Sequence, residues 1–328
     1  MNTNVRMAVV AVLTATATIA VPGIASQVNA LITFTANSPA KASEVNSNFT
    51  AVKTAVDDNQ AQIIALRTEL AELKAKLTNV TAVNDYLSLQ TVNGQPTVRV
   101  SAANFQVVNG RGNTDSNNGT GNLIVGYDEL RPDGSQKTCS IGIANDISNA
   151  SSCASASGVW AENHKSGSHN LIVGTKNNYS SYGSVLFGIG NASVDAYTSV
   201  IGGQDNIAGG PLSSVTGGNN NAAWGLYGSI QGGSSNLATG ESSTVVGGYL
   251  NSATGPLSVV AGGRSNVASG YQSAVSGGGF NKASELRSVV SGGSTNDASG
   301  IDSVVSGGSN RIATDAIRWV GGSYSAAN

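Results

Sequence analysis

The sequence predicts a mainly β protein: a parallel β-roll or solenoid of 14–15-residue repeats, preceded by a parallel α-helical coiled coil. Paired glycines recur from Gly202-Gly203 to Gly307-Gly308 at intervals of 15 residues, and Gly321-Gly322 follows after 14. A fixed period of this length is typical of a solenoid, whose repeats stack because none can bury a core alone. Upstream, apolar residues between Val45 and Val80 alternate in steps of four and three, which is typical of a coiled coil.

Residues 1–30 are expected to be a cleaved secretory signal peptide. Arg6 supplies a positive charge, residues 7–21 are apolar, and Val28-Asn29-Ala30 offers a small-residue cleavage site. An uncleaved anchor is less favoured, because the stretch is short and rich in threonine and alanine. We therefore expect a secreted, extracellular or outer-surface protein with no membrane insertion after cleavage.

Residues 38–82 are predicted to form the coiled-coil stalk, with Ser38-Pro39 as its cap and first helical residue. Asn59 occupies a d position within the apolar seam, and a buried asparagine there fixes register and oligomer state at some loss of stability. The heptads alone do not distinguish a dimer from a trimer. The a positions are Phe49, Val56, Ile63, Leu70 and Leu77, and the d positions are Val45, Val52, Asn59, Leu66, Leu73 and Val80.

Residues 83–121 are predicted to be a connector of short strands. Alternating apolar residues flank Asn93-Gly94, a pair that favours a two-residue hairpin turn. Phe105 and Val107 suggest a further strand, and a loop rich in glycine and asparagine follows.

Residues 122–169 are predicted to be a first coil with a long insertion. The sequence Asn-Leu-Ile-Val-Gly occurs at 122–126 and again at 170–174, where the regular repeats begin. The intervening 127–169 contain Cys139 and Cys153, for which a disulfide is expected after export. Their spacing to His164 and His169 lacks the close cysteine pair of most structural zinc sites, so no metal or cofactor is expected.

Residues 170–325 are predicted to form the β-roll. Numbering each repeat so that the glycine pair takes positions five and six, position three is Val or Ile, position eleven is Ala, and position thirteen is Gly in six of eight repeats. The positions that keep one residue type alternate with variable ones. This alternation predicts two short strands per repeat, joined at glycine corners with positive φ. One Val and one Ala per coil make a thin roll that buries little apolar surface, so self-association is expected. Position nine predicts an asparagine ladder: Asn206, Asn221, Asn236, Asn251, Asn266, Asn281 and Asn296.

Charge is sparse. The balance of 17 basic and 19 acidic residues gives −2, and removal of Arg6 with the leader leaves 16 minus 19, or −3. No basic stripe suited to nucleic acid is present, and aromatic residues are too few for single-strand stacking.

The repeats resemble the YadA-like head repeats of trimeric autotransporter adhesins. The resemblance rests on Ser288-Val289-Val290-Ser291-Gly292 followed by Ala298-Ser299-Gly300, and it covers about residues 170–325. It implies a left-handed β-roll that packs as a homotrimer, and an Asn59 layer that holds an anion such as chloride. The repeat is 15 residues rather than the family's usual 14, the coiled coil precedes the roll, and no counterpart of the family's C-terminal membrane anchor is expected after residues 323–328.

The favoured function is therefore a secreted or cell-surface homotrimer with an adhesin-like head, binding an extracellular protein or glycan. The alternatives are a structural fibre or spacer and a phage-tail-fibre-like receptor-binding protein. A polysaccharide-cleaving enzyme is least favoured, because no two acids of the repeats share a position in adjacent coils. Trp160 and Trp224 are the candidate ligand contacts, since exposed tryptophans often anchor interfaces.

Overall fold

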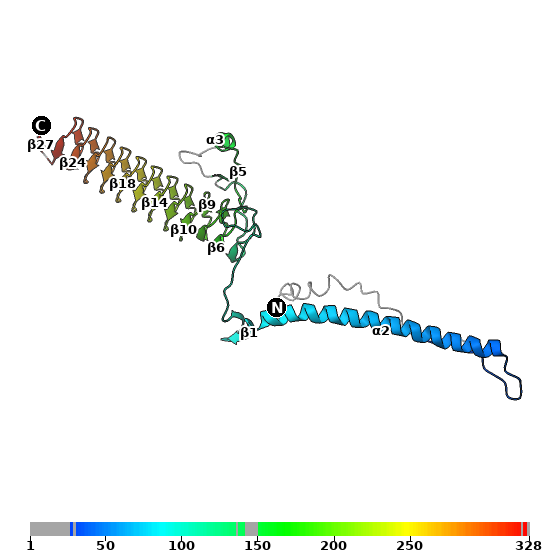
Figure 1. Ribbon diagram of the computed structural model, residues 1–328. Helices are drawn as coiled ribbons and strands as arrows, with labels where there is room; N and C mark the ends of the chain where they lie inside the picture. Colours follow the sequence, from blue (N-terminus) through cyan, green and yellow to red (C-terminus); the bar gives the residue numbers. More distant parts are fainter. Residues whose placement is uncertain (1–26, 29–30, 136, 142–149, 323, 327–328) are drawn as a thin grey trace. The chain divides into compact units, whose positions relative to one another are not determined.

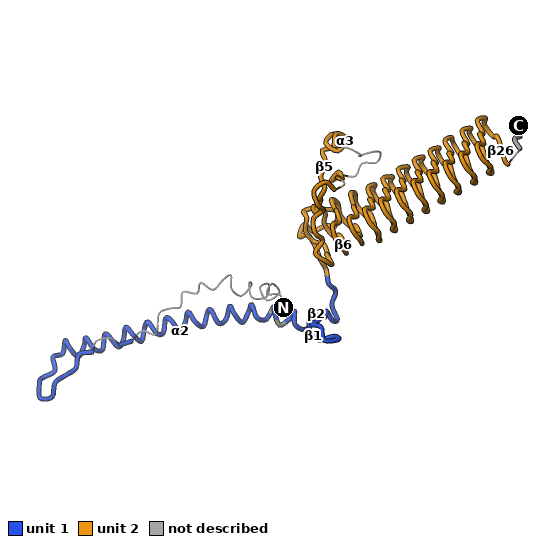
Figure 2. Tube along the Cα trace, turned by 180° about the vertical axis from the view of Figure 1, so that it is seen from behind, with its two compact units in different colours: residues 1–105 blue, residues 106–328 orange. Residues whose placement is uncertain are grey.

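The computed structural model describes residues 27–28, 31–135, 137–141, 150–322 and 324–326. These residues form two compact units that divide after Phe105 (Figure 2). The predicted signal peptide lies outside the described residues apart from 27–28. None of the helices in the described ranges combines the length and apolar character that a membrane span needs.

The first unit is dominated by one long helix, α2 (Ala42–Asn84). At 1.5 Å per residue it extends about 65 Å. The predicted start at Ser38-Pro39 is wrong: Lys41 is the N-cap residue, with extended backbone and no capping bond from its side chain. Ser38 instead closes a preceding turn by donating its backbone N–H to the Thr35 carbonyl. The structure thus shows the predicted stalk as one long helix, and its association with other helices stays a prediction.

A β-hairpin follows the helix within the same unit. Strand β1 (Leu87–Val92) pairs antiparallel with β2 (Gln95–Val100). The turn residues Asn93 and Gly94 have φ of 51° and 79°, as a type I′ turn requires, so the predicted hairpin is confirmed. The further strand suggested by Phe105 and Val107 is wrong, because this segment forms no strand and pairs with none of the described strands.

The second unit is a parallel β-solenoid of about ten turns (Figure 1). Each coil contributes one short strand to each of two sheets, so the predicted fold class is confirmed for this part of the chain. In the described residues the larger sheet has 13 strands: β3 (Leu123–Val125), β6 (Leu171–Thr175), β8 (Val185–Ile189), β10 (Ser199–Val200), β12 (Ser214–Val215), β14 (Ser229–Ile230), β16 (Thr244–Val245), β18 (Val259–Val260), β20 (Ala274–Val275), β22 (Val289–Val290), β24 (Val304–Gly307), β26 (Trp319–Gly321) and β27 (Tyr324–Ala326).

The second sheet is built from the other strand of each coil. Its ten strands in the described chain are β7 (Asn178–Tyr179), β9 (Ala192–Ser193), β11 (Ile207–Ala208), β13 (Ala222–Ala223), β15 (Leu237–Ala238), β17 (Ser252–Ala253), β19 (Val267–Ala268), β21 (Lys282–Ala283), β23 (Asp297–Ala298) and β25 (Ile312–Ala313).

The strand register reproduces the sequence period. Ser199 pairs with Ser214, a step of 15, whereas Leu171 pairs with Val185, a step of 14. Leu123 of β3 pairs with Leu171 of β6, so residues 122–126 do form an earlier coil and the chain between the two copies is inserted. At the other end β27 folds back antiparallel on β26.

The interior of each coil is half apolar and half polar. The valine of position three and the alanine of position eleven form one continuous buried cluster from Val200 to Val320. The residues of positions one and nine, mostly serine and asparagine, are buried as completely. Buried polar groups of this kind usually need hydrogen-bond partners. The asparagine amides of position nine have them, whereas four buried hydroxyls of position one have none among the described residues: those of Ser213, Ser243, Ser258 and Ser273.

The residues that adopt a left-handed backbone at the corners are not all the ones that we predicted. Glycine at position six has positive φ, as in Gly248 at 88°, and so do the non-glycine residues at positions eight and fifteen, such as Leu250 at 57° and Leu257 at 58°. Glycine at position thirteen, where we also expected positive φ, never has it. Where this position is glycine, close stacking is the reason instead: a Cβ on Gly255 would lie 2.1 Å from the carbonyl oxygen of Gly270 in the next coil. Two other coils carry Glu285 and Asp315 at this position.

We predict that Gly255→Ala destabilises the solenoid by about 2–3 kcal/mol, because the stacked backbones must move apart. The matched control is Gly247→Ala, at a position without positive φ where an added Cβ meets no atom within 4 Å. That control should be neutral or slightly stabilising, since alanine restricts the unfolded chain. Urea denaturation of the two variants checks the difference, and equal midpoints would contradict the steric explanation.

Candidate functional site

The asparagine ladder joins each coil to the next through its side-chain amides. Asn251 donates from Nδ2 to the carbonyl oxygens of Gly247 in its own coil (2.8 Å) and Gly263 in the next (2.9 Å). Its Oδ1 accepts the backbone N–H of Asn266 at 3.0 Å. Every polar atom of this buried amide is therefore used, and both glycine carbonyls sit in the corner beside it.

The ladder is longer than predicted. Asn191 accepts the N–H of Asn206 at 2.8 Å, and Asn177 accepts the N–H of Asn191 at 3.0 Å. The sequence signal was available, since these two residues precede Asn206 at intervals of 15 and 14. At the far end Arg311 occupies position nine and donates its backbone N–H to Asn296 Oδ1 at 2.9 Å.

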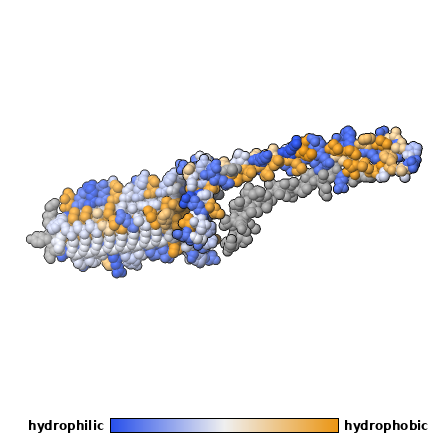
Figure 3. Space-filling model, turned by 90° about the horizontal axis from the view of Figure 1, so that it is seen from below, coloured by the Kyte–Doolittle hydropathy of each residue, from blue (hydrophilic) through white to orange (hydrophobic). Residues whose placement is uncertain are grey.

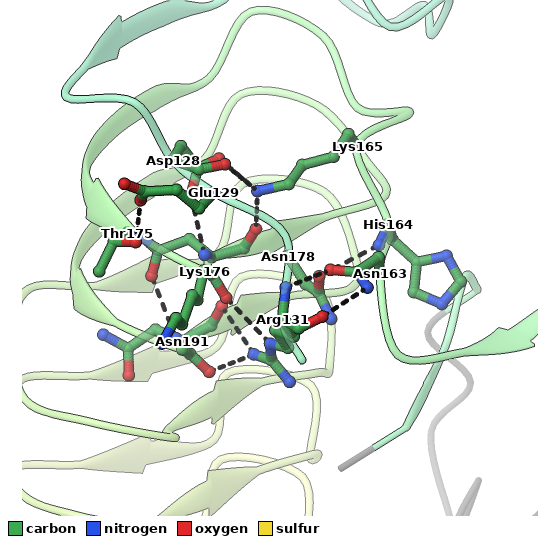
Figure 4. Close-up of polar contacts among 12 residues, drawn as sticks. Asp128, Glu129, Arg131, Asn163, His164, Lys165, Thr175, Lys176, Asn178 and Asn191 are labelled. Atoms are coloured by element: carbon green, nitrogen blue, oxygen red, sulfur yellow. Dashed lines mark hydrogen bonds and ion pairs between the residues drawn. The ribbon is translucent and has the colours of Figure 1, made fainter. Parts of the chain in front are cut away.

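A buried aspartate begins the ladder. Asp128, in the insertion after β3, accepts the N–H of Asn177 on Oδ1 at 2.9 Å, so its carboxylate takes the place of an asparagine amide (Figure 4). Its other oxygen forms an ion pair with Lys165 Nζ, which also donates to the Asn177 carbonyl at 2.6 Å. Burial lowers the pKa of Lys165, whereas the hydrogen bond to Asp128 acts in the opposite direction. The pair is therefore a salt bridge between a buried carboxylate and a half-buried ammonium.

Arg131 anchors the same insertion to two coils. The residue is buried, and its guanidinium donates from Nε to the Lys176 carbonyl at 2.9 Å and from Nη2 to the carbonyls of Gly190 and Asn191. Its backbone is held by Asn163, whose Oδ1 accepts the Arg131 N–H at 2.8 Å (Figure 4). Burial lowers the pKa of Arg131, with the carboxylates of Asp205 and Asp128 opposing this shift.

The returning part of the insertion covers the edge of the second sheet. His164 accepts the Tyr179 N–H on its backbone carbonyl at 2.8 Å, and its own N–H donates to Asn178 Oδ1 at 3.1 Å. Asn178 Nδ2 in turn donates to the Glu162 carbonyl at 2.8 Å. The polar cluster thus supplies hydrogen-bond partners to the first coil of the solenoid. Without it, the backbone groups at this edge could pair with other chains. Its chemistry is that of an end cap.

A small disulfide-bonded lobe projects from this cap. It contains β4 (Thr138–Cys139), α3 (Ala150–Ser155) and β5 (Trp160–Ala161), and β4 pairs antiparallel with β5. The structure joins Cys139 to Cys153, with an S–S distance of 1.99 Å and Cα atoms 5.6 Å apart. Trp160 packs against the buried disulfide.

The histidines are used within the chain. His164 Nε2 lies 2.9 Å from the Thr138 carbonyl, and His169 bonds the Thr114 carbonyl at 3.0 Å and the Asn109 N–H at 3.1 Å. Among the described residues no group of three or more His, Cys, Asp or Glu side chains is placed to hold a metal ion.

The two tryptophans named as ligand contacts are both half-buried. Trp160 covers the disulfide, and Trp224 packs against the cluster of Ala192, Val194 and Ile207. The Trp224 ring lies directly over Gly209, where a Cβ would come within 2.0 Å of it. Both residues thus have packing partners within the chain, and their role as ligand contacts stays a prediction.

Asn59 lies half-buried on α2 between the seam residues Val56 and Ile63. The anion that the family resemblance implies at this layer stays a prediction. No protein-family model matches this sequence, and no curated protein matches it. The function proposed below therefore rests on the chemistry of the chain itself.

We predict that Asn251→Ala destabilises the protein by about 2–4 kcal/mol, because the Gly247 carbonyl and the Asn266 N–H lose the partners that Asn251 provides. The same substitution at Asn219, an exposed neighbour of the ladder, is the control and should change stability little. Chemical denaturation followed by circular dichroism checks both. A loss at position 251 no larger than at 219 would contradict a stabilising role for the ladder.

We predict that Asp128→Asn lowers stability by about 2 kcal/mol, because the half-buried ammonium of Lys165 then loses its counter-charge. Adding Lys165→Met should restore most of the loss, since both charges are then removed together. Asp57→Asn, which breaks an exposed ion pair with Lys53, is the matched control and should leave the melting temperature unchanged. Additive losses in the double variant would show that the two residues act independently.

Proposed function

We propose that this chain is an exported, homotrimeric fibrous protein whose β-roll is an adhesin-like head that binds an extracellular ligand. The observation that carries the proposal is the apolar seam of α2, defined as the a and d residues given above. Nine of these eleven residues are exposed in the single chain, including Phe49 at 70%, Leu70 at 50% and Leu77 at 59%. Apolar side chains follow the length of the helix in Figure 3.

A continuous apolar seam at heptad spacing is a surface for other helices of the same kind. A single helix of this sequence would leave the seam in water, whereas two further copies would bury it by knobs-into-holes packing. The association is proposed as parallel, and the Asn59 layer then lies inside the bundle. The number three comes from the resemblance to trimeric adhesins, where such asparagine layers bind an anion.

The hairpin extends this surface within the first unit. Leu87 faces Val100 across the pair and Leu89 faces Val98, so these four side chains share one face. All four are exposed, Leu89 at 77% and Val98 at 69%. Because a two-stranded hairpin is marginal alone, copies that cover this face would stabilise it.

The roll offers surfaces that also fit self-association. Exposed apolar residues follow the corner at positions fourteen and fifteen through nearly every coil: Leu212, Tyr227, Leu257, Tyr271, Ile301 and Ile317. The outward positions two and four of the larger sheet carry no charged residue in the eight repeats. Figure 3 shows a broad pale band of side chains with intermediate hydropathy along the solenoid. Surfaces that recur along the roll in this way are what an interface between copies needs.

Export is supported by the predicted leader and by the disulfide of the cap, because disulfides persist mainly in oxidising compartments. A left-handed roll, as in the resembled family, completes the proposal. An enzyme is not proposed, because Asp128, Arg131 and Lys165 of the cap are engaged in contacts within the chain.

We predict that residues 31–328 have the mass of a trimer in solution by light scattering after size exclusion. Replacing Leu66 and Leu73 with Asp should produce species of lower mass, because each d layer would then bring carboxylates together. Ala75→Asp, at an outward heptad position, is the matched control and should keep the wild-type mass. A monomeric wild-type chain would overturn the proposal.

A further inference from the structure

One corner of the solenoid carries a patch that the repeat does not explain. We call positions seven and eight of the eight repeats the corner row. Its position-seven residues are aligned by successive parallel bridges from Gln204 to Ser309. Most coils place small polar side chains in this row, for example Asn219-Asn220, Ser234-Ser235 and Ser294-Thr295. Three consecutive coils instead supply Tyr249-Leu250, Arg264-Ser265 and Gly279-Phe280.

The large residues of this patch are unfavourable for the fold. Position eight has a left-handed backbone, with φ of 57° at both Leu250 and Phe280. Asn, Asp and Gly tolerate this conformation better than bulky residues do, and Asp205 and Asn220 occupy it elsewhere in the row. Leu250 and Phe280 are also 45% and 55% exposed, so they add little to the core. Residues that contradict local preference without a packing gain point to function.

Arg264 lies between two aromatic rings of the patch. Its guanidinium carbon is 6.0 Å from the Tyr249 ring centroid and 5.6 Å from that of Phe280, in adjacent coils on either side. Cation–π attraction holds the side chain there and displaces part of its water. No acidic side chain of the described chain forms a salt bridge with Arg264. The only acidic residue of the corner row, Asp205, is four coils away.

We infer that this patch, Tyr249, Leu250, Arg264 and Phe280, binds an acidic polysaccharide. The guanidinium fork offers two parallel donors to a carboxylate or sulfate. Aromatic rings and Leu250 offer apolar surface to the faces of sugar rings. The hydroxyls and amides that continue the row in both directions offer hydrogen bonds at the strand spacing of about 4.8 Å. An open row of this kind fits a linear polymer laid along the roll. This inference names the ligand class of the proposed extracellular binder and rests on that proposal.

The test measures binding of residues 31–328 to three polymers by surface plasmon resonance: polygalacturonate, which carries only carboxylates, dextran sulfate, which carries only sulfates, and neutral dextran. We expect saturable binding of one or both acidic polymers and none of dextran. Arg264→Gln should weaken binding about tenfold or more, the effect of losing one charge-assisted contact. Phe280→Ser, which restores a residue found at position eight in other coils, should weaken binding similarly without lowering the melting temperature.

Lys282→Gln is the control, because it removes an equal charge from an exposed position two residues after Phe280, outside the corner row. Its binding should stay within about twofold of wild type. An equal loss in both charge variants, or none in Arg264→Gln, would overturn the site, as would equal binding of dextran. Light scattering on the same samples separates the two proposals. A trimer that binds no acidic polymer contradicts this inference alone, whereas a monomer contradicts the proposed trimer.

Discussion

The solenoid depends on one buried amide per coil. With one valine and one alanine as its apolar content, a coil gains too little from the hydrophobic effect to order its own corners. The asparagine at position nine satisfies a carbonyl in its own corner, a carbonyl in the next coil and the next asparagine's N–H. Each amide therefore closes a corner and fixes the spacing to its neighbour in the same step. The glycine at position six follows from this arrangement, because a Cβ on Gly248 would lie 2.2 Å from the Gly263 carbonyl oxygen.

Much of the repeat architecture could be predicted because periodic constraints appear in the sequence as columns. The inward valines, the alanines and the ladder were visible in this way, and Asn177 and Asn191 would have been found by continuing the count. The corner conformations were harder to predict. A recurring glycine at position thirteen looks the same in the sequence whether it provides positive φ or avoids a clash. The non-glycine residues that do adopt positive φ share no residue type and so left no column.

The cap could not be predicted for a related reason. Asp128, Arg131 and Lys165 belong to no repeated column, and Lys165 is more than 30 residues from the other two in the sequence. They meet their partners only after the insertion folds back on the first coil. A pattern that occurs once is indistinguishable from a surface loop without coordinates. The disulfide was expected from composition alone, whereas the packing of Trp160 on it was not. The same distinction between repeated and unique residues separates the surfaces of the roll: features present in every coil suit contacts between copies, and the isolated Tyr249, Arg264 and Phe280 suit a ligand.

The direction of the ladder has a consequence for how such a protein changes over generations. The side-chain oxygen of each amide accepts a backbone N–H from the following coil. The first member of the ladder therefore needs only an acceptor oxygen, and the last member needs only a backbone N–H. A carboxylate can therefore serve at Asp128, and an arginine at position nine of the final repeat, although neither could replace an interior asparagine. All interior coils make the same contacts with their neighbours. Duplication or loss of a whole 15-residue unit would leave both ends intact, so the length of the roll is free to vary through gene recombination while its termini stay fixed.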